Sequence, residues 1–213
     1  MYFFDLDGTL LDSNGIWLDI DMEFLGRYGI HPVPEEYTDY VTHHAFWDAA
    51  EYTRACFHLP LTAEEIIQTW QEMAREAYAN QLPLKPGARV FLERAFQAGK
   101  RCVLITSCIP DLCHAALERH GLAPFFEEVL TTTGMGLEKR DPRLFQVLAE
   151  RFGRRPEDCI LFDDSPIYCA AAKEAGWQIR GVADEAFDYL RADMEALCGS
   201  DFPFVFSAET PLP

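Results

Sequence analysis

Hydrophobic residues follow two different rhythms along this chain. Short apolar runs that end in polar residues predict buried strands, and segments in which apolar residues recur every three or four positions predict amphipathic helices. We expect strands within residues 2–6, 101–107, 127–132, 159–165 and 177–182. We expect helices over 17–28, 46–57, 62–77 and 87–98, and further helices that begin near residues 110, 142 and 166. The predicted class is therefore α/β.

The two rhythms divide the chain into two parts. From residue 85 onward strands alternate with helices, which predicts a Rossmann-like parallel sheet with helices on both faces. Between the first strand and residue 83 only helical patterns occur, and Thr62 with Glu65 forms a capping box there. We expect one domain from residues 1–13 and 83–213, and a small all-helical domain from residues 14–82. The turn-rich tail after residue 198 supports no prediction.

Composition limits the partners that this protein can have. The formal net charge of the 213 residues is −17, so the surface repels nucleic acid and anionic membranes. A phosphorylated substrate is repelled as well, unless its site carries local positive charge. No apolar stretch approaches the length of a membrane span, and we expect no secretory leader. A monomer is favoured, although the sequence does not establish the oligomeric state.

Cysteine usage favours a reducing compartment. The chain has seven cysteines, an odd number, and no Cys-x-x-Cys pair, so we expect no disulfide framework and a cytoplasmic location. Cys108, Cys113 and His114 are potential zinc ligands, but they lack the paired spacing of a tetrahedral site.

Polar residues follow three of the predicted strands where each strand ends. They are Asp5 and Asp7, then Thr106 and Ser107, then Asp163 and Asp164. Parallel sheets bind ligands beyond the carboxyl ends of their strands, where the strand order reverses. A further charged residue, Lys139, lies in a loop before a predicted helix. Four carboxylates that converge there cannot all stay ionised without a cation, and oxygen ligands suit Mg²⁺.

Each of these residues also has a purely structural interpretation. Asp-Gly-Thr is a good turn sequence. Threonine, serine and aspartate are common caps at the starts of helices, which is the structural alternative for Thr106 with Ser107 and for Asp163 with Asp164. Lys139 stands between Glu138 and Arg140, where a solvated charge is the alternative interpretation, although its place just before Asp141 and Pro142 favours the functional one.

The motifs together resemble those of a known superfamily. "DLDGTLLDS", "VLITS", "EKRDP" and "LFDDS" occur in the order and spacing of the four motifs of the haloacid dehalogenase superfamily. The helical insert resembles the cap domain of its β-phosphoglucomutase-like phosphatase branch. The resemblance spans nearly the whole chain and implies a Rossmann-like catalytic core, a cap over residues 14–82, and Mg²⁺-dependent hydrolysis of a small phosphorylated metabolite.

The resemblance also implies a role for each motif residue. Asp5 would be the nucleophile that forms an aspartyl-phosphate, and Asp7 would be the general acid and then the general base. The Thr106 hydroxyl and the Ser107 amide would bind the phosphoryl oxygens. Lys139 would neutralise charge on the nucleophile and on the phosphoryl group.

The implied metal ligands come from the first and last motifs. Asp5, the Asp7 backbone carbonyl and Asp164 would bind Mg²⁺ directly, and Asp163 would bind it directly or through water. Many relatives carry an aspartate four residues after the last ligand, whereas this chain has Tyr168 there. We expect this departure to change ligand detail rather than the class of enzyme.

Three functions remain open at this point. An acid two residues after the nucleophile favours phosphate monoester chemistry. A phosphomutase must grip a second phosphate, yet residues 31–80 contain only Arg54 and Arg75 besides four histidines, so hydrolysis is favoured. A catalytically idle phospho-ligand binding module is the third alternative, and the intact motif residues argue against it.

The cap segment "THHAFWDAAEYTR" leaves the substrate undecided. His43, His44, Trp47 and Arg54 occupy the region where such caps contact the leaving group. In the alternative interpretation the aromatic residues pack inside the cap and the histidines are exposed. We expect hinges near residues 13–15 and 82–85, because caps of this kind open and close at each turnover.

Overall fold

The computed structural model describes residues 1–43, 46–132 and 135–213. It divides into two compact units, one formed by Met1–Asn14 with Leu82–Pro213 and the other by Gly15–Gln81. We describe each unit by itself. Their assignment as catalytic core and cap domain remains a prediction.

The first unit is built on a five-stranded parallel sheet of order β3-β2-β1-β4-β5. The strands are β1 (Tyr2–Phe4), β2 (Cys102–Thr106), β3 (Glu128–Thr131), β4 (Ile160–Asp163) and β5 (Gln178–Gly181). In the register of the sheet, Phe4 of β1 lies opposite Leu104 of β2 and Phe162 of β4. The chain passes from β1 to one side of the sheet and returns to the other side at β4, so the strand order reverses beside β1.

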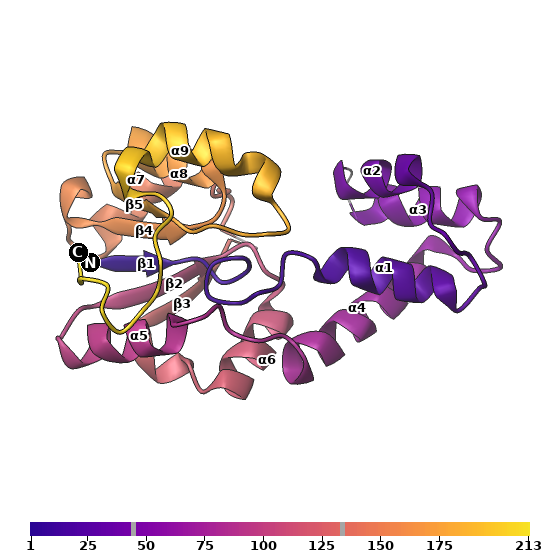
Figure 1. The fold of residues 1–213 in the computed structure, drawn as a ribbon, viewed down its shortest axis with the longest axis horizontal. Helices are drawn as coiled ribbons and strands as arrows, with labels where there is room; N and C mark the ends of the chain where they lie inside the picture. The colour runs from indigo at the N-terminus through magenta and orange to yellow at the C-terminus, as the bar shows by residue number, and fades with distance from the viewer. Residues whose placement is uncertain (44–45, 133–134) are drawn as a thin grey trace. The chain divides into compact units, whose positions relative to one another are not determined.

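Helices cover both faces of this sheet (Figure 1). One face carries α5 (Ala88–Gln97) and α6 (Pro110–His120), and the other carries α7 (Pro142–Arg151), α8 (Pro166–Glu174) and α9 (Arg191–Cys198). Proline occupies the first turn of α6, α7 and α8, where its missing amide hydrogen costs no helical bond. Single turns of 3₁₀ helix occur at Ala123–Phe125 (η1), Pro156–Asp158 (η2), Asp188–Leu190 (η3) and Gly199–Asp201 (η4). The predicted Rossmann-like α/β class is confirmed.

Aromatic residues pack on both sides of the central strand. Phe4 stacks on Phe162 at 4.5 Å between ring centres, and on the other side Phe3 packs against Trp177 at 4.4 Å. The C-terminal tail completes the first of these clusters, because Phe206 is only 4% exposed and contacts both Phe4 and Phe162. The sequence pattern did not predict this role for the tail.

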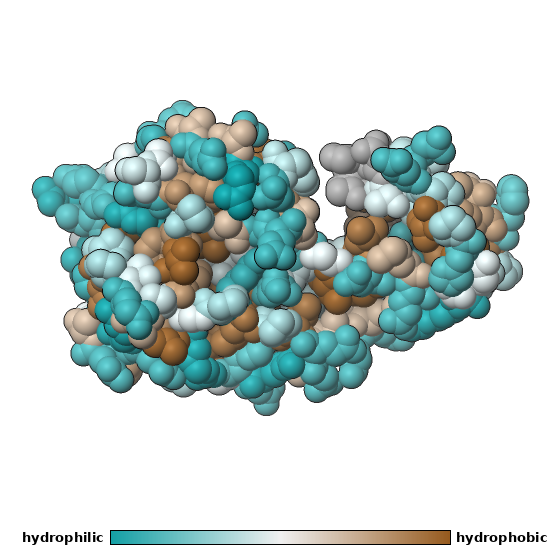
Figure 2. Space-filling model, viewed as in Figure 1, coloured by the Kyte–Doolittle hydropathy of each residue, from teal (hydrophilic) through white to brown (hydrophobic). Residues whose placement is uncertain are grey.

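The second unit consists of α1 (Ile16–Gly26), α2 (Glu35–His43), α3 (Phe46–Cys56) and α4 (Ala63–Asn80). The predicted capping box is confirmed at the start of α4, where the Thr62 side chain accepts from the Glu65 amide and the Glu65 side chain accepts from the Thr62 amide. Helix α2 was not predicted, because its sequence is mostly polar and follows two prolines. Hydrophobic and hydrophilic residues both appear on the surface of this unit (Figure 2).

Candidate functional site

Three carboxylates meet at the carboxyl end of the sheet. Asp5 directly follows β1, Asp163 ends β4 and Asp164 comes next in the chain. One oxygen from each of these side chains lies within 4.8 Å of the other two. The register explains this convergence, because β1 and β4 are parallel neighbours and Phe4 lies opposite Phe162. The structure thus brings residues about 160 positions apart into one cluster.

The Lys139 ammonium lies inside the carboxylate cluster. Its Nζ donates to Asp5 Oδ1 at 2.6 Å and pairs with Asp163 Oδ2 at 2.6 Å, and the side chain is 0% exposed. The loop that carries Lys139 leads into α7, where the Asp141 side chain caps the helix by accepting from the Arg143 amide. Lys139 is therefore a buried charge of the site and not a solvated one.

Burial and mutual repulsion shift the titration of the cluster. Burial raises the pKa of Asp5 well above its usual value, the other carboxylates raise it further, and Lys139 opposes this shift. Burial and the charge of Asp163 raise the pKa of Asp164 to about 7. Burial alone would lower the pKa of Lys139, but Asp163 and Asp5 raise it above its usual value, so the ammonium stays protonated.

The residues present fit a divalent cation. One ammonium cannot neutralise three carboxylates, and burial together with the neighbouring carboxylates raises the pKa of both Asp5 and Asp164. Closely grouped carboxylate oxygens are the donor set that Mg²⁺ prefers. Asp5, Asp163 and Asp164 are the side chains that would hold it.

Asp164 is oriented by residues of the first motif and the segment after it. Thr9 Oγ1 donates to its Oδ1 at 3.0 Å, and Asn14 Nδ2 donates to its Oδ2 at 2.7 Å. Gly8 has φ +74°, and a Cβ there would overlap both Asn14 Nδ2 and Asp164 Oδ2. Sequence reasoning missed Thr9 and Asn14 as partners of Asp164. Their hydrogen-bonding side chains, one inside the first motif and one directly after it, were the signal.

Asp7 and the β2 end lie next to the cluster. Ser13 Oγ donates to Asp7 Oδ1 at 2.7 Å, which fixes the carboxylate of Asp7 in its loop. Thr106 is the last residue of β2 and is buried, and its Oγ1 accepts from the Cys108 amide at 3.0 Å. Ser107 follows Thr106, and its Oγ accepts from Thr132 at 3.4 Å. Since β2 is the other neighbour of β1, Thr106 and Ser107 stand at the same edge of the sheet as Asp5.

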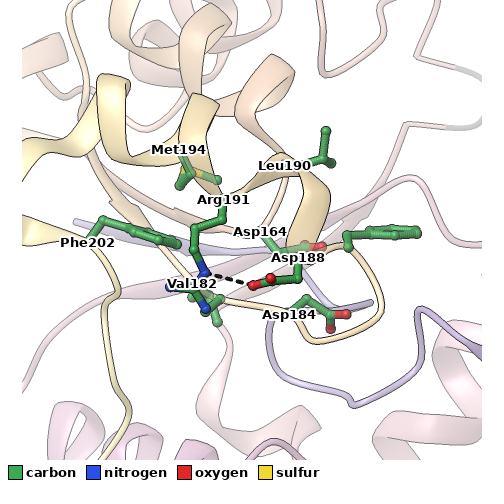
Figure 3. A pocket seen from close by; sticks show the side chains of 10 residues that line it. Asp164, Val182, Asp184, Asp188, Leu190, Arg191, Met194 and Phe202 are labelled. Carbon is green, nitrogen blue, oxygen red and sulfur yellow. Dashed lines mark hydrogen bonds and ion pairs between the residues drawn. The ribbon is translucent and has the colours of Figure 1, made fainter.

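A pocket opens on one side of Asp164 (Figure 3). Residues after β5 and from α9 line it, among them Asp184, Asp188 and Arg191. Arg191 Nε bonds to Asp188 Oδ1 at 2.7 Å, as the dashed line in Figure 3 marks. The arginine of this pocket is therefore already paired with a carboxylate.

The helical unit is described only in part at the predicted specificity segment. The His43 side chain and His44 lie outside the described residues. Trp47 is 48% exposed, and Arg54 pairs with Glu51 at 2.9 Å. Tyr52 stacks on Tyr40 at 3.9 Å between ring centres, so this aromatic residue packs within the unit.

The cysteines take no part in the cluster. They form no disulfide in the part of the chain that the structure describes, where Asp5, Asp163 and Asp164 form the group suited to a metal and the Cys108, Cys113 and His114 combination does not. In the same ranges, every helix is too short or too polar to cross a bilayer.

Comparisons with known proteins place the chain in a family. The sequence pattern of the haloacid dehalogenase-like hydrolases matches residues 1–176. The GMP/IMP nucleotidase YrfG of Escherichia coli K12 is 30% identical over 182 residues, which cover 81% of this chain and 77% of the relative. A phosphoserine phosphatase of Thermus thermophilus is 39% identical over 84 residues, but this match covers only 39% of this chain and 34% of that protein.

Solved structures agree on the fold. A protein of Thermotoga maritima that is assigned as a beta-phosphoglucomutase superposes with a TM-score of 0.77 and 23% identity, over 86% of this chain and 85% of the other. The sequence pattern matches well over half of the residues, and the carboxylate cluster stands where its first and last motifs meet. The chain therefore belongs to the haloacid dehalogenase-like hydrolase family.

Proposed function

We propose that this hydrolase is a Mg²⁺-dependent phosphatase that cleaves the phosphate monoester of a small metabolite through an aspartyl-phosphate intermediate. The observation that carries the proposal is the cluster of Asp5, Asp163 and Asp164 around the buried Lys139 ammonium. It supplies a nucleophilic oxygen, a cation site and a local positive charge at one place on a protein of net charge −17. Family membership and relatives named as phosphatases support the same chemistry.

Asp5 acts as the nucleophile. One carboxylate oxygen attacks phosphorus and forms the new P–O bond as the bond to the leaving alkoxide breaks. Its Oδ1 is held by Lys139 at 2.6 Å, which fixes the side chain and neutralises part of its charge. Bound Mg²⁺ would supply Lewis-acid stabilisation of the charge on the transferring phosphoryl group.

Asp7 moves the protons. Its carboxyl group protonates the leaving oxygen in the first half of the reaction. As a carboxylate it then takes a proton from the water that attacks the aspartyl-phosphate, and inorganic phosphate leaves while Asp5 is regenerated. The Ser13 hydroxyl, 2.7 Å from Asp7 Oδ1, orients the carboxyl group for both transfers.

The phosphoryl oxygens are bound from the neighbouring strand. The Thr106 hydroxyl and the Ser107 amide lie at the end of β2 and supply hydrogen bonds. Positioning and electrostatics account for most of the catalysis in phosphoryl transfer, so the rigid carboxyl ends of three adjacent strands are a suitable platform.

The charge of the helical unit favours hydrolysis over a mutase reaction. Residues 15–81 contain twelve acidic residues but only three arginines and no lysine. Arg27 pairs with Glu23 at 2.8 Å and Arg54 with Glu51 at 2.9 Å. A unit with this charge is unsuited to grip the second phosphate that a mutase must retain.

The first test is Asp5→Asn, which keeps the size of the side chain and removes the nucleophilic charge. We expect the wild type to release phosphate from p-nitrophenyl phosphate with Mg²⁺, and to lose this activity in EDTA. We expect Asp5→Asn to lower kcat by about a thousandfold or more, because no covalent intermediate forms.

A matched control removes a different aspartate charge. Asp158 is exposed, pairs with Arg155 at 2.9 Å and lies just before β4, away from its carboxyl end. We expect Asp158→Asn to keep the wild-type kcat, because exposed ion pairs contribute little. Metal-dependent turnover that survives in Asp5→Asn would contradict the proposal. With sugar phosphates, an isomerised product in place of free phosphate would indicate a mutase.

A further inference from the structure

The Lys139 ammonium has a third neighbour besides its two carboxylates. Its Nζ lies 4.7 Å from the centre of the Tyr168 ring, over the face of that ring. A lysine ammonium within about 6 Å of an aromatic face is attracted by the negative charge density of the ring. Tyr168 lies in the first turn of α8, four residues after Asp164. The ends of β1 and β4 and the start of α8 thus all contact one ammonium.

An aromatic ring is well suited to the position beside the Lys139 ammonium. Lys139 is fully buried, so each of its contacts must offset part of the cost of taking the ammonium out of water. A further carboxylate would do so, but it would add negative charge beside Asp5, Asp163 and Asp164. A tyrosine ring attracts the ammonium without adding a formal charge. It also restricts a side chain that otherwise has four rotatable bonds.

We propose that Tyr168 is a positioning residue that holds the ammonium of Lys139 against Asp5 and Asp163 through its ring and not through its hydroxyl. This inference rests on the proposed function, in which Lys139 neutralises charge at Asp5 during phosphoryl transfer. Without the ring, the ammonium is free to move from the position between the two carboxylates. Transition-state stabilisation is then lost, whereas substrate binding depends on it less.

Two substitutions separate the ring from the hydroxyl. Tyr168→Phe keeps the ring, and Tyr168→Leu removes it while leaving an apolar side chain. With p-nitrophenyl phosphate and saturating Mg²⁺, we expect Phe to keep kcat within about twofold of wild type. We expect Leu to lower kcat by roughly three- to thirtyfold with little change in KM, which is the range of a desolvated cation–π contact. Ile167→Ala, at the neighbouring 66% exposed position, is the control and should match the wild type.

A second measurement does not depend on activity. A proton that lies over an aromatic face resonates upfield, so the ammonium protons of Lys139 should show an upfield ring-current shift in ¹⁵N-resolved NMR spectra. The signal is assigned by its loss in Lys139→Met. We expect the shift in wild type and Tyr168→Phe, and its loss in Tyr168→Leu.

The results distinguish this inference from the proposed function. A wild type without phosphatase turnover would overturn the proposed function, and the NMR shift would still report on Tyr168. A wild-type kcat in Tyr168→Leu, an equal loss in Tyr168→Phe, or a folded wild type without the upfield shift would overturn the positioning role.

Discussion

Gly8 shows how one residue without a side chain shapes the site. Its φ of +74° turns the chain directly after Asp7, and its Cα faces Asn14 and Asp164 so closely that a Cβ has no room. The two side chains that occupy this space are hydrogen-bonded to each other at 2.7 Å. Glycine is therefore required at this position both for its conformation and for the orientation of a candidate metal ligand.

We expect Gly8→Ala to disturb the site more than it disturbs the fold. The positive φ costs about 1 kcal/mol of unfolding free energy, and the added methyl group displaces Asp164, which should lower kcat for p-nitrophenyl phosphate by about tenfold or more. Gly99→Ala is the matched control, since Gly99 has φ +68° but nothing within 4 Å of its Cβ position. It should lose similar stability in urea denaturation and keep its kcat. Equal kcat in the two variants would contradict this explanation.

Helix α1 carries a buried acid that no catalytic role explains. Asp21 is 6% exposed, and its Oδ1 accepts from the Tyr37 hydroxyl of α2 at 2.9 Å. The same hydroxyl lies 2.8 Å from Thr53 Oγ1 of α3, so the contact links three helices. Asp21 Oδ2 has no hydrogen-bond partner in the part of the chain that the structure describes. Burial raises the pKa of Asp21 to about 6, although the Tyr37 bond opposes this shift.

The stability of the helical unit should therefore depend on pH. The pKa of Asp21 is higher in the folded state than its usual value near 3.9, so the folded state retains the proton that the unfolded state releases. The contribution of Asp21 to stability is complete below about pH 4 and is lost as pH rises to about 6. We expect Asp21→Asn to flatten this slope and to raise the unfolding free energy at pH 7 by about 1–2 kcal/mol.

Denaturation in urea across this pH range checks the prediction. Asp19→Asn is the control, because Asp19 lies on the same helix and is exposed. Its pH slope should follow the wild type. If Asp21→Asn keeps the wild-type slope between pH 4 and 6, another group is responsible for the pH dependence.

At the scale of the whole molecule, the chain passes twice between the units, and the first of these connections begins beside the site. The first unit ends at Asn14, which bonds to Asp164, and resumes at Leu82. Shortly after, the Lys85 amide donates to the Leu10 carbonyl at 2.9 Å, and Lys85 Nζ pairs with Asp184 at 2.5 Å. These bonds fix the far end of the second predicted hinge to the first unit.

Hydrogen exchange tests the two predicted hinges. We expect the amides of residues 13–15, Leu82 and Leu84 to exchange more slowly when Mg²⁺ and beryllium fluoride, a phosphate mimic, are bound. The Lys85 amide should exchange slowly in both states because of its bond to Leu10, and it serves as an internal control. Equal exchange at residues 13–15 in the two states would rule out a hinge there.

Much of the fold was predictable because it depends on local pattern. Short-range preferences of the backbone explain three of the correct predictions: the capping box at Thr62, the proline at position 142 and the apolar run that ends at Asp163. Helices α4 and α7 and strand β4 form at these positions. Helices α2 and α9 were missed because tertiary contacts stabilise them more than their own sequence does. Met194 of α9, for example, is buried in the core beside β5.

The sequence by itself determined the α/β class and the candidate carboxylates, and it predicted a helical segment after the first strand, because these follow from residue type, order and spacing. Only the tertiary structure decided which groups surround Lys139, how Thr9 and Asn14 orient Asp164, and that Phe206 closes the core. Those contacts join segments far apart in the chain, and their geometry depends on strand register and on the packing of whole elements, which no local pattern encodes.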